Sequence, residues 1–255
     1  MKFVIGDIHG EIKKLILLIN VLKKFRIDEL IFIGDYIDKG QNSREVLTFL
    51  GKLSYKYKCT FLIGNHEFYW LKYLKENDLK ALEKLKRYGA ITTVRDFGIN
   101  SFDRKSLYFS LYLKNINFFD KLKLFYEDER YIVVHSGVSP NRITFSIDEK
   151  NTESYLTQRY NFLSMKSLYF NKKIVFGHTG FIYPYFDGYK VGIDTSAVYG
   201  YHLTSFCISN DFFINEAGEI ISLDDIDLNM CPIIMRNLPE RLKNEKNFNS
   251  CSPSG

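Results

Sequence analysis

The sequence predicts an α/β fold, and three observations carry that prediction. Short apolar runs alternate with stretches of helical periodicity in the first third of the 255-residue chain. The distance between successive runs leaves room for one helix and one strand, which is typical of βαβ units and a parallel or mixed sheet. Each of the first three runs also ends in glycine followed by an acid or an amide, at Gly6-Asp7, Gly34-Asp35 and Gly64-Asn65.

The first third of the chain is expected to form three strands joined by two helices. The strands are expected at residues 2–5, 30–33 and 59–63. A helix is expected over residues 11–24, because Ile12, Leu15 and Ile19 recur at helical spacing with lysines opposite. A second helix is expected over residues 43–53.

The remaining two thirds are expected to hold covering helices and further strands. Residues 68–126 are rich in helix formers and aromatic residues, which predicts helices near 71–74 and 79–85 in an insertion that faces the substrate. No repeat or linker divides the chain, so one domain is expected over residues 1–225, and the order of the polar extension 226–255 is left open. Strands are expected at 131–134 and 173–176, followed by antiparallel strands at 189–193, 203–208 and 211–214.

Composition and charge exclude several classes of protein. With 45% apolar and 25% charged residues, the chain is neither collagen-like nor disordered. Its longest apolar run, residues 15–22, is too short for a membrane span, and no signal sequence develops, so a cytoplasmic protein is expected. The four cysteines are scattered, which argues against a disulfide framework or a structural zinc site. The net charge of +5 is spread as lysine pairs, so no nucleic-acid partner is expected.

Four of the five histidines directly follow predicted strand ends, where ligands bind in open α/β sheets. One such histidine would more often be a hydrogen-bonded core residue, whereas four, interleaved with acids and an amide, are hard to explain structurally. Imidazole, carboxylate and amide groups without thiolate suit manganese, iron or zinc. A bridging carboxylate would divide the set between two cations roughly 3.5–4 Å apart. The fifth histidine, His202, is expected to be structural. The set comprises Asp7, His9, Asp35, Asn65, His66, His135 and His178.

Five segments, in order, resemble the signature of the calcineurin-like metallophosphoesterases. More narrowly, they are similar to the phosphoprotein phosphatase family, which includes serine/threonine phosphatases of bacterial and phage type. The resemblance implies a four-layer αββα sandwich, with two mixed β-sheets flanked by helices. Residues 193–200, which read I-D-T-S-A-V-Y-G, resemble the I-D-T-G-x-x-x-G stretch that follows. The five segments are Gly6-Asp7-Ile8-His9-Gly10, Gly34-Asp35-Tyr36-Ile37-Asp38-Lys39-Gly40, Gly64-Asn65-His66-Glu67, Val134-His135-Ser136-Gly137-Val138 and Val175-Phe176-Gly177-His178-Thr179.

The resemblance also implies a role for each site residue. A hydroxide held between two divalent cations, most fittingly Mn²⁺ with iron or zinc as alternatives, attacks phosphorus in line. His66 is the implied general acid, held in its charged form by Asp38. Lys39, where the family has arginine, and Arg159 are the implied phosphate ligands, while Ile63 replaces a further family arginine. The implied metal ligands are Asp7 and His9 for the first cation, Asp35 as the bridge, and Asn65, His135 and His178 for the second.

Three functions compete on this basis. The first is a metal-dependent phosphomonoesterase acting on a phosphoprotein or a small phosphorylated substrate, with serine/threonine or dual specificity. The second is a dinucleoside polyphosphate hydrolase resembling the symmetrical diadenosine tetraphosphatases, and the third is a non-catalytic binding module. The Asp38-Lys39-Gly40 segment favours the first, and the full ligand set argues against the third. Gly180 argues against a nuclease or phosphodiesterase, because those branches carry a second histidine there. The sequence leaves the oligomeric state open.

Overall fold

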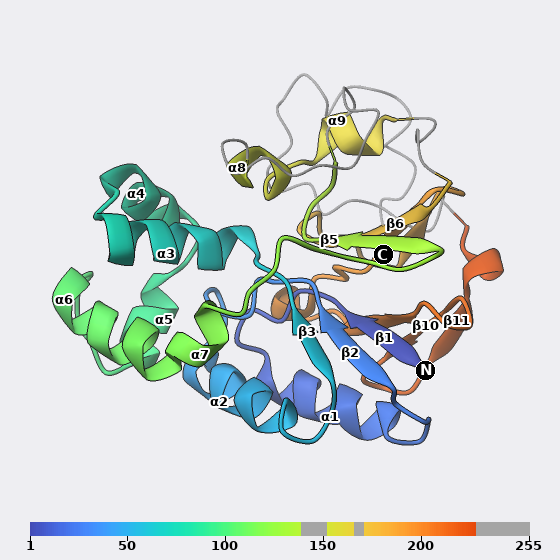
Figure 1. Ribbon diagram of the computed structural model, residues 1–255, viewed down its shortest axis with the longest axis horizontal. Helices are drawn as coiled ribbons and strands as arrows, with labels where there is room; N and C mark the ends of the chain where they lie inside the picture. Colours follow the sequence, from blue (N-terminus) through green and yellow to red (C-terminus); the bar gives the residue numbers. More distant parts are fainter. Residues whose placement is uncertain (139–151, 166–170, 228–255) are drawn as a thin grey trace, which may run out of the picture.

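Two β-sheets lie face to face in the computed structural model, with helices on both outer sides (Figure 1). The structure describes residues 1–138, 152–165 and 171–227. This arrangement confirms the expected α/β class and the αββα order of layers. Nearly all of the extension 226–255 lies outside the described residues, so its order stays open.

The first sheet contains the strands that lead into the N-terminal motifs. Its order is β11-β10-β9-β1-β2-β3, in which β1, β2 and β3 are parallel and the other neighbours are antiparallel. Helices α1 and α2 cover its outer face (Figure 1). The bounds are β1 Lys2–Ile5, α1 Ile12–Leu22, β2 Glu29–Phe32, α2 Ser43–Leu53, β3 Cys59–Phe61, β9 Thr204–Cys207, β10 Phe212–Asn215 and β11 Ile220–Ser222.

The second sheet has the order β4-β5-β6-β8-β7. The expected strand at 189–193 is present as β8, but its expected antiparallel pairing is only half right. It pairs in parallel with β6 and antiparallel with β7, because a short run of apolar residues does not encode the direction of its neighbours. The bounds are β4 Phe125–Glu127, β5 Tyr131–Val134, β6 Lys173–Phe176, β7 Tyr185–Phe186 and β8 Lys190–Gly192.

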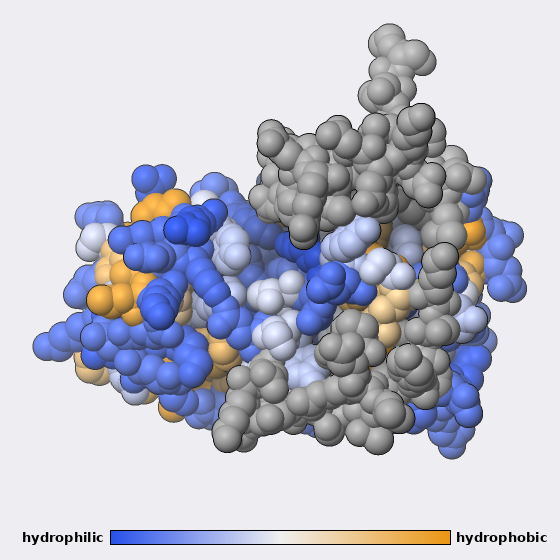
Figure 2. All heavy atoms as spheres, turned by 90° about the horizontal axis from the view of Figure 1, so that it is seen from above, coloured by the Kyte–Doolittle hydropathy of each residue, from blue (hydrophilic) through white to orange (hydrophobic). Residues whose placement is uncertain are grey.

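The expected insertion forms a helical lobe beside the two sheets, at the left of Figure 1. Seen from above, the surface of this lobe is largely hydrophilic (Figure 2). Two further short helices lie above the second sheet. None of the described helices has the length and apolar character that crossing a bilayer requires. The helices are α3 Asn65–Glu76, α4 Leu79–Arg87, α5 Ile91–Asp96, α6 Arg104–Leu107 and α7 Ile116–Phe119 in the lobe, then α8 Thr152–Tyr155 and α9 Tyr160–Leu163; short turns cover Tyr108–Tyr112, Leu113–Asn115, Ala197–Tyr199 and Leu223–Asp225.

Alternate residues of the central strands face two different cores. Phe3 of β1 packs in the cluster that contains the buried residues of α1 and α2, whereas its neighbour Val4 packs with Val133 and Val175 of the second sheet. Ile174 of β6 belongs to a third cluster. This period of two is the geometry of a strand buried on both faces. Packing on both faces therefore holds these strands in place, and with them the positions of the residues that follow.

Candidate metal centre

Parallel pairing brings the polar residues after the strands to one place. Because β1, β2 and β3 are parallel neighbours, the residues that follow them meet at one edge of the first sheet. β5 and β6 are also parallel and deliver two histidines from the second sheet. All of these side chains lie in buried positions, except His178, which is partly exposed.

Two clusters of possible metal ligands share the carboxylate of Asp35. One contains His9 and His66, and the other contains His135 and His178, each with Asp35. The Asp35 oxygens lie 3.3 Å from His9 Nε2, 3.8 Å from His66 Nε2 and 3.4 Å from His135 Nε2. Asp35 therefore holds the central position that the sequence resemblance implies for it.

The orientation of two imidazoles fits metal binding. His9 Nδ1 lies 2.9 Å from the carbonyl oxygen of Ile37, and His135 Nδ1 lies 2.9 Å from that of Ile33. A ring that donates its Nδ1 proton to a carbonyl presents the lone pair of Nε2 to the site, as metal-bound histidines do. Lys39 Nζ lies 2.7 Å from His9 Nε2, so a positive group already occupies the direction of that lone pair. The oxygen and nitrogen donors fit a pair of divalent cations.

Asn65 and Asp7, the two remaining residues of the predicted ligand set, contact its histidines. Asn65 Oδ1 lies 3.0 Å from His135 Nε2. The Asp7 carboxylate accepts the backbone N–H of His178, at 3.3 and 3.2 Å. Burial, and then the charges of Asp194 and Asp35, raise the pKa of Asp7 well above its ordinary value. Asp194 was not assigned from the sequence, although it stands in the I-D-T-S segment.

Burial and mutual contacts set the charges of this cluster. Burial, and next the charge of Lys39, lower the pKa of His9 to about 4. Burial also lowers the pKa of His135, and burial followed by the charge of Arg159 lowers that of His178 well below its usual value. For Asp35 burial acts to raise the pKa, but the surrounding histidines outweigh it and hold that pKa well below the ordinary value. The lowered pKa values favour the neutral forms of His9, His135 and His178 and the ionised form of Asp35, which are the forms that bind cations, whereas the raised pKa of Asp7 disfavours its carboxylate in the absence of a cation.

His66 and Asp38 form a buried pair beside the ligands. His66 Nδ1 lies 2.7 Å from Asp38 Oδ2, and both residues are at most 2% exposed. Asp38 also accepts the indole N–H of Trp70, at 3.0 and 3.1 Å, and the hydroxyl of Thr93, at 2.5 Å. Trp70 and Thr93 come from the helical lobe and lie outside the sequence motifs, so neither was predicted to contact the site.

Backbone strain is concentrated at this centre. Eight non-glycine residues in the described ranges have positive φ, and six of them belong to the site. Such conformations cost free energy and persist where the surrounding structure enforces them, often at functional sites. The six are His9, Asp35, Asp38, Lys39, His178 and Ser196.

A cavity of about 340 Å³ opens onto the centre. Its walls carry both predicted phosphate ligands, Lys39 and Arg159, together with Arg87 from the end of α4. Two partly exposed rings, Tyr88 and Tyr199, also line it. Sequence reasoning missed Arg87 and Tyr88, because a charged and an aromatic residue at the end of an amphipathic helix carry no motif.

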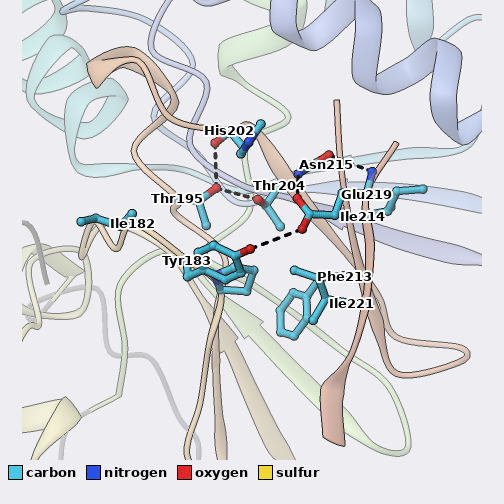
Figure 3. Close-up of a pocket in the computed structure, with 11 residues that line it drawn as sticks. Ile182, Tyr183, Thr195, His202, Thr204, Phe213, Ile214, Asn215, Glu219 and Ile221 are labelled. Carbon is cyan, nitrogen blue, oxygen red and sulfur yellow. Dashed lines mark hydrogen bonds between the residues drawn. The ribbon is translucent and has the colours of Figure 1, made fainter. Parts of the chain in front are cut away.

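His202 lies in a different hollow, shown in Figure 3. This hollow has a volume of about 20 Å³, room for about one water molecule. The His202 carbonyl accepts the hydroxyl of Thr195, and its ring lies 3.2 Å from Glu216. These contacts are consistent with the expected structural role.

Comparison with known proteins connects this centre to a family. The model of the calcineurin-like phosphoesterases matches residues 3–194, well over half of the chain. The chain belongs to the calcineurin-like phosphoesterase family. The matched segment contains every residue of the predicted metal-ligand set, and Ser196 lies just beyond it.

Two relatives of this phosphoesterase bear different names. An asymmetrical bis(5'-nucleosyl)-tetraphosphatase of Oceanobacillus iheyensis is 24% identical over 250 residues, covering 84% of this chain and 91% of that protein. The serine/threonine-protein phosphatase PP1-1 of Saccharomyces cerevisiae is 33% identical over 140 residues, covering 54% of this chain but only 39% of that protein.

A solved structure shares the fold of this phosphoesterase. The cold-active protein-tyrosine phosphatase of a Shewanella species superposes with a TM-score of 0.61 at 16% identity, covering 87% of this chain and 80% of that one. At this level of identity the likeness extends to the fold alone.

Proposed function

We propose that this phosphoesterase is a metal-dependent phosphomonoesterase that removes phosphate from serine and threonine, and also tyrosine, side chains of proteins. The buried pair of His66 and Asp38 carries the proposal. The Nδ1 of His66 is bound to Asp38, while its Nε2 faces Asp35 at 3.8 Å. An alkoxide is a poor leaving group, so a positioned proton donor accelerates its departure. A histidine fixed next to the carboxylate of Asp35 suits that task.

The proposed metal ligands follow the placement of the side chains around Asp35. Two divalent cations bound there would polarise the phosphoryl group and lower the pKa of water. Manganese is the proposed metal, with iron or zinc as alternatives, because imidazole and carboxylate suit all three. The ligands are Asp7 and His9 for the first cation, Asp35 for both, and Asn65, His135 and His178 for the second.

Three positively charged side chains that line the cavity are proposed to bind the phosphate. Lys39 supplies a point charge, whereas Arg87 and Arg159 can each grip two oxygens with a planar guanidinium. Arg87 compensates for the arginine that Ile63 replaces, since it brings a second guanidinium to the cavity from another element.

A second candidate is hydrolysis of dinucleoside polyphosphates. The Oceanobacillus relative favours it, because the alignment covers nearly the whole of that protein. The sequence suggested the symmetrical type, whereas this relative is named asymmetrical. When a dinucleoside polyphosphate is hydrolysed, the leaving group is a nucleotide phosphate, which needs less protonation than an alkoxide. The pair of His66 and Asp38 therefore favours the first candidate.

A substrate panel tests the two candidates. Turnover is measured on phosphoserine, phosphothreonine and phosphotyrosine peptides and on diadenosine tetraphosphate, with Mn²⁺ added and removed. We expect Mn²⁺-dependent release of phosphate from the peptides. Faster cleavage of the dinucleotide would favour the second candidate, and no turnover of any substrate would contradict both.

The His66→Asn variant tests the proposed general acid. Turnover of an alkyl phosphate should fall by roughly 10²–10⁴, and that of p-nitrophenyl phosphate by less, because its leaving group needs little protonation. Both metals should remain bound by elemental analysis, although His66 lies within the first ligand cluster. His202→Asn is the matched control and should leave turnover unchanged. Equal losses on both substrates, or loss of metal, would assign His66 a different role.

A further inference from the structure

The hydroxyl of Ser196 has no use in the structure as it stands. Ser196 is 3% exposed, and its Oγ has no hydrogen-bond partner among the described residues. It lines the cavity at the metal centre. Thr179 Oγ1 is the other such oxygen among the described residues. A buried hydroxyl without a partner costs free energy, because it has lost its hydrogen bonds to water.

The backbone of Ser196 is also in an unfavourable conformation. Its φ of 59° and ψ of 41° lie in the left-handed region, which glycine adopts far more readily than serine. The I-D-T-G stretch that residues 193–200 resemble has glycine here. The Ser196 N–H donates to Asp194 Oδ1 at 3.0 Å, which fixes this conformation. Two costs at one residue indicate that the hydroxyl serves a contact made from the cavity.

The neighbouring glycine packs directly against this hydroxyl. Ser196 Oγ is itself buried, and a Cβ at Gly180 would lie only 2.5 Å from it. Gly180 and Ser196 both line the cavity, so the hydroxyl lies in the cavity wall. Rotation of the Ser196 side chain between staggered rotamers would present the Oγ to a group bound in the cavity.

The charge of the cavity identifies the kind of group that would pair with this hydroxyl. Lys39, Arg87 and Arg159 all line the cavity and select an anionic ligand. The exposed atoms of a phosphate are hydrogen-bond acceptors, so the hydroxyl must donate. We propose that Ser196 Oγ donates a hydrogen bond to a phosphoryl oxygen of the substrate and so helps determine substrate affinity. This inference rests on the proposed phosphoesterase function and adds a binding residue to it.

Two variants test the contact on the Mn²⁺-loaded full-length chain. Ser196→Gly removes the hydroxyl and relieves the left-handed backbone, and Ser196→Ala removes the hydroxyl alone. Both should raise the KM for p-nitrophenyl phosphate, and the Kd for inorganic phosphate measured by calorimetry, roughly tenfold or more, because the lost bond is to a charged group. The kcat should stay within about twofold, since the contact exists in ground and transition states alike.

Asn77→Gly is the matched control. Asn77 also has a positive φ, of 57°, but it ends α3 at an exposed position and does not line the cavity. It should change the melting temperature without changing the KM or the phosphate Kd. Since Ser196→Gly relieves strain, its melting temperature should not fall, so unfolding cannot explain a loss of affinity.

The outcomes separate this proposal from the proposed function. Unchanged KM and phosphate Kd in both Ser196 variants, with an active wild type, would overturn the contact and leave the phosphoesterase function standing. A wild type that turns over no phosphate ester would contradict the function, while the phosphate affinities of the variants would still decide the contact.

Discussion

Burial and then the charge of Lys39 lower the pKa of His9 in the folded protein from an ordinary value of 6.5 to about 4. In the unfolded chain the same imidazole takes up a proton near pH 6.5. Between these two values the unfolded state binds more protons, so the contribution of His9 to stability is complete above pH 6.5 and is lost as the pH falls towards 4.

Metal-free wild type and His9→Asn should therefore differ in their pH dependence. The difference between their free energies of unfolding should favour the wild type by about 3 kcal/mol more at pH 6.5 than at pH 4. Urea unfolding at several pH values measures it, and comparing the two proteins cancels the titrating groups that do not interact with His9. A difference independent of pH would show that His9 titrates normally.

A further prediction for a single residue concerns Trp70, whose indole N–H donates to both carboxylate oxygens of Asp38. Trp70→Phe should lower turnover of an alkyl phosphate roughly tenfold, because Asp38 loses a hydrogen bond to a charged group and holds His66 less well. The loss on p-nitrophenyl phosphate should be smaller, which a merely structural defect would not produce. Tyr73 lies in the same helix as Trp70, and its hydroxyl donates to the carbonyl oxygen of Phe102. As a control, Tyr73→Phe should lower the turnover of both substrates only slightly and to the same extent.

At the scale of elements, two glycines have opposite requirements. Gly51 lies inside α2, and a Cβ there would meet no atom within 4 Å. Gly34 follows β2 with a φ of 107°, and a Cβ there would lie 2.4 Å from Gly64 N. Gly51→Ala should stabilise the protein by about 0.5–1 kcal/mol through helix propensity. Gly34→Ala should destabilise it by more than about 2 kcal/mol. Urea midpoints measure both, and equal effects would contradict the close approach of β2 and β3.

The elements also show what the sequence can and cannot predict. Strands β1, β2 and β3 were predicted because an apolar run followed by glycine and a polar residue is a local signal. α2 was predicted at its observed bounds, since its periodicity stops at Leu53. The pairing of β8 was half wrong, because strand direction depends on the chain's path through the whole sheet.

The residues of the site also divide into those with a local sequence signal and those placed by the packing of the chain. The proposed ligands could be placed because each follows a strand in a recognisable motif. Arg87, Trp70 and Thr93 could not, because they reach the site through the packing of the helical lobe. The sequence shows that Ser196 stands where the I-D-T-G stretch has glycine, but only the structure shows that its hydroxyl lacks a hydrogen-bond partner.

At the scale of the whole molecule, the proposed ligands come from both sheets. Asp7, His9, Asp35 and Asn65 follow strands of the first sheet, whereas His135 and His178 follow strands of the second. Cations bound between them would hold the two sheets together. Metal that binds only the folded state stabilises it by about 4 kcal/mol at a free concentration 1,000 times its Kd.

Chelation should therefore lower the melting temperature, and added Mn²⁺ should restore it. Asp35→Asn should abolish the metal-dependent shift, because both clusters lose their shared carboxylate. His202→Asn should keep the shift in full. Calorimetric melting with and without chelator measures all three proteins, and a shift retained in Asp35→Asn would place the cations elsewhere.

The helical lobe meets the cavity along its inner margin, through Asn65, His66, Arg87, Tyr88 and Gly89. Its helices α3 and α5 also hold Asp38 through Trp70 and Thr93, so these helices are tied to the reaction itself. Helices α6 and α7 supply no residue to the lining of the cavity. Evolution can therefore lengthen or shorten the outer part of the lobe far more freely than the part that begins at Asn65.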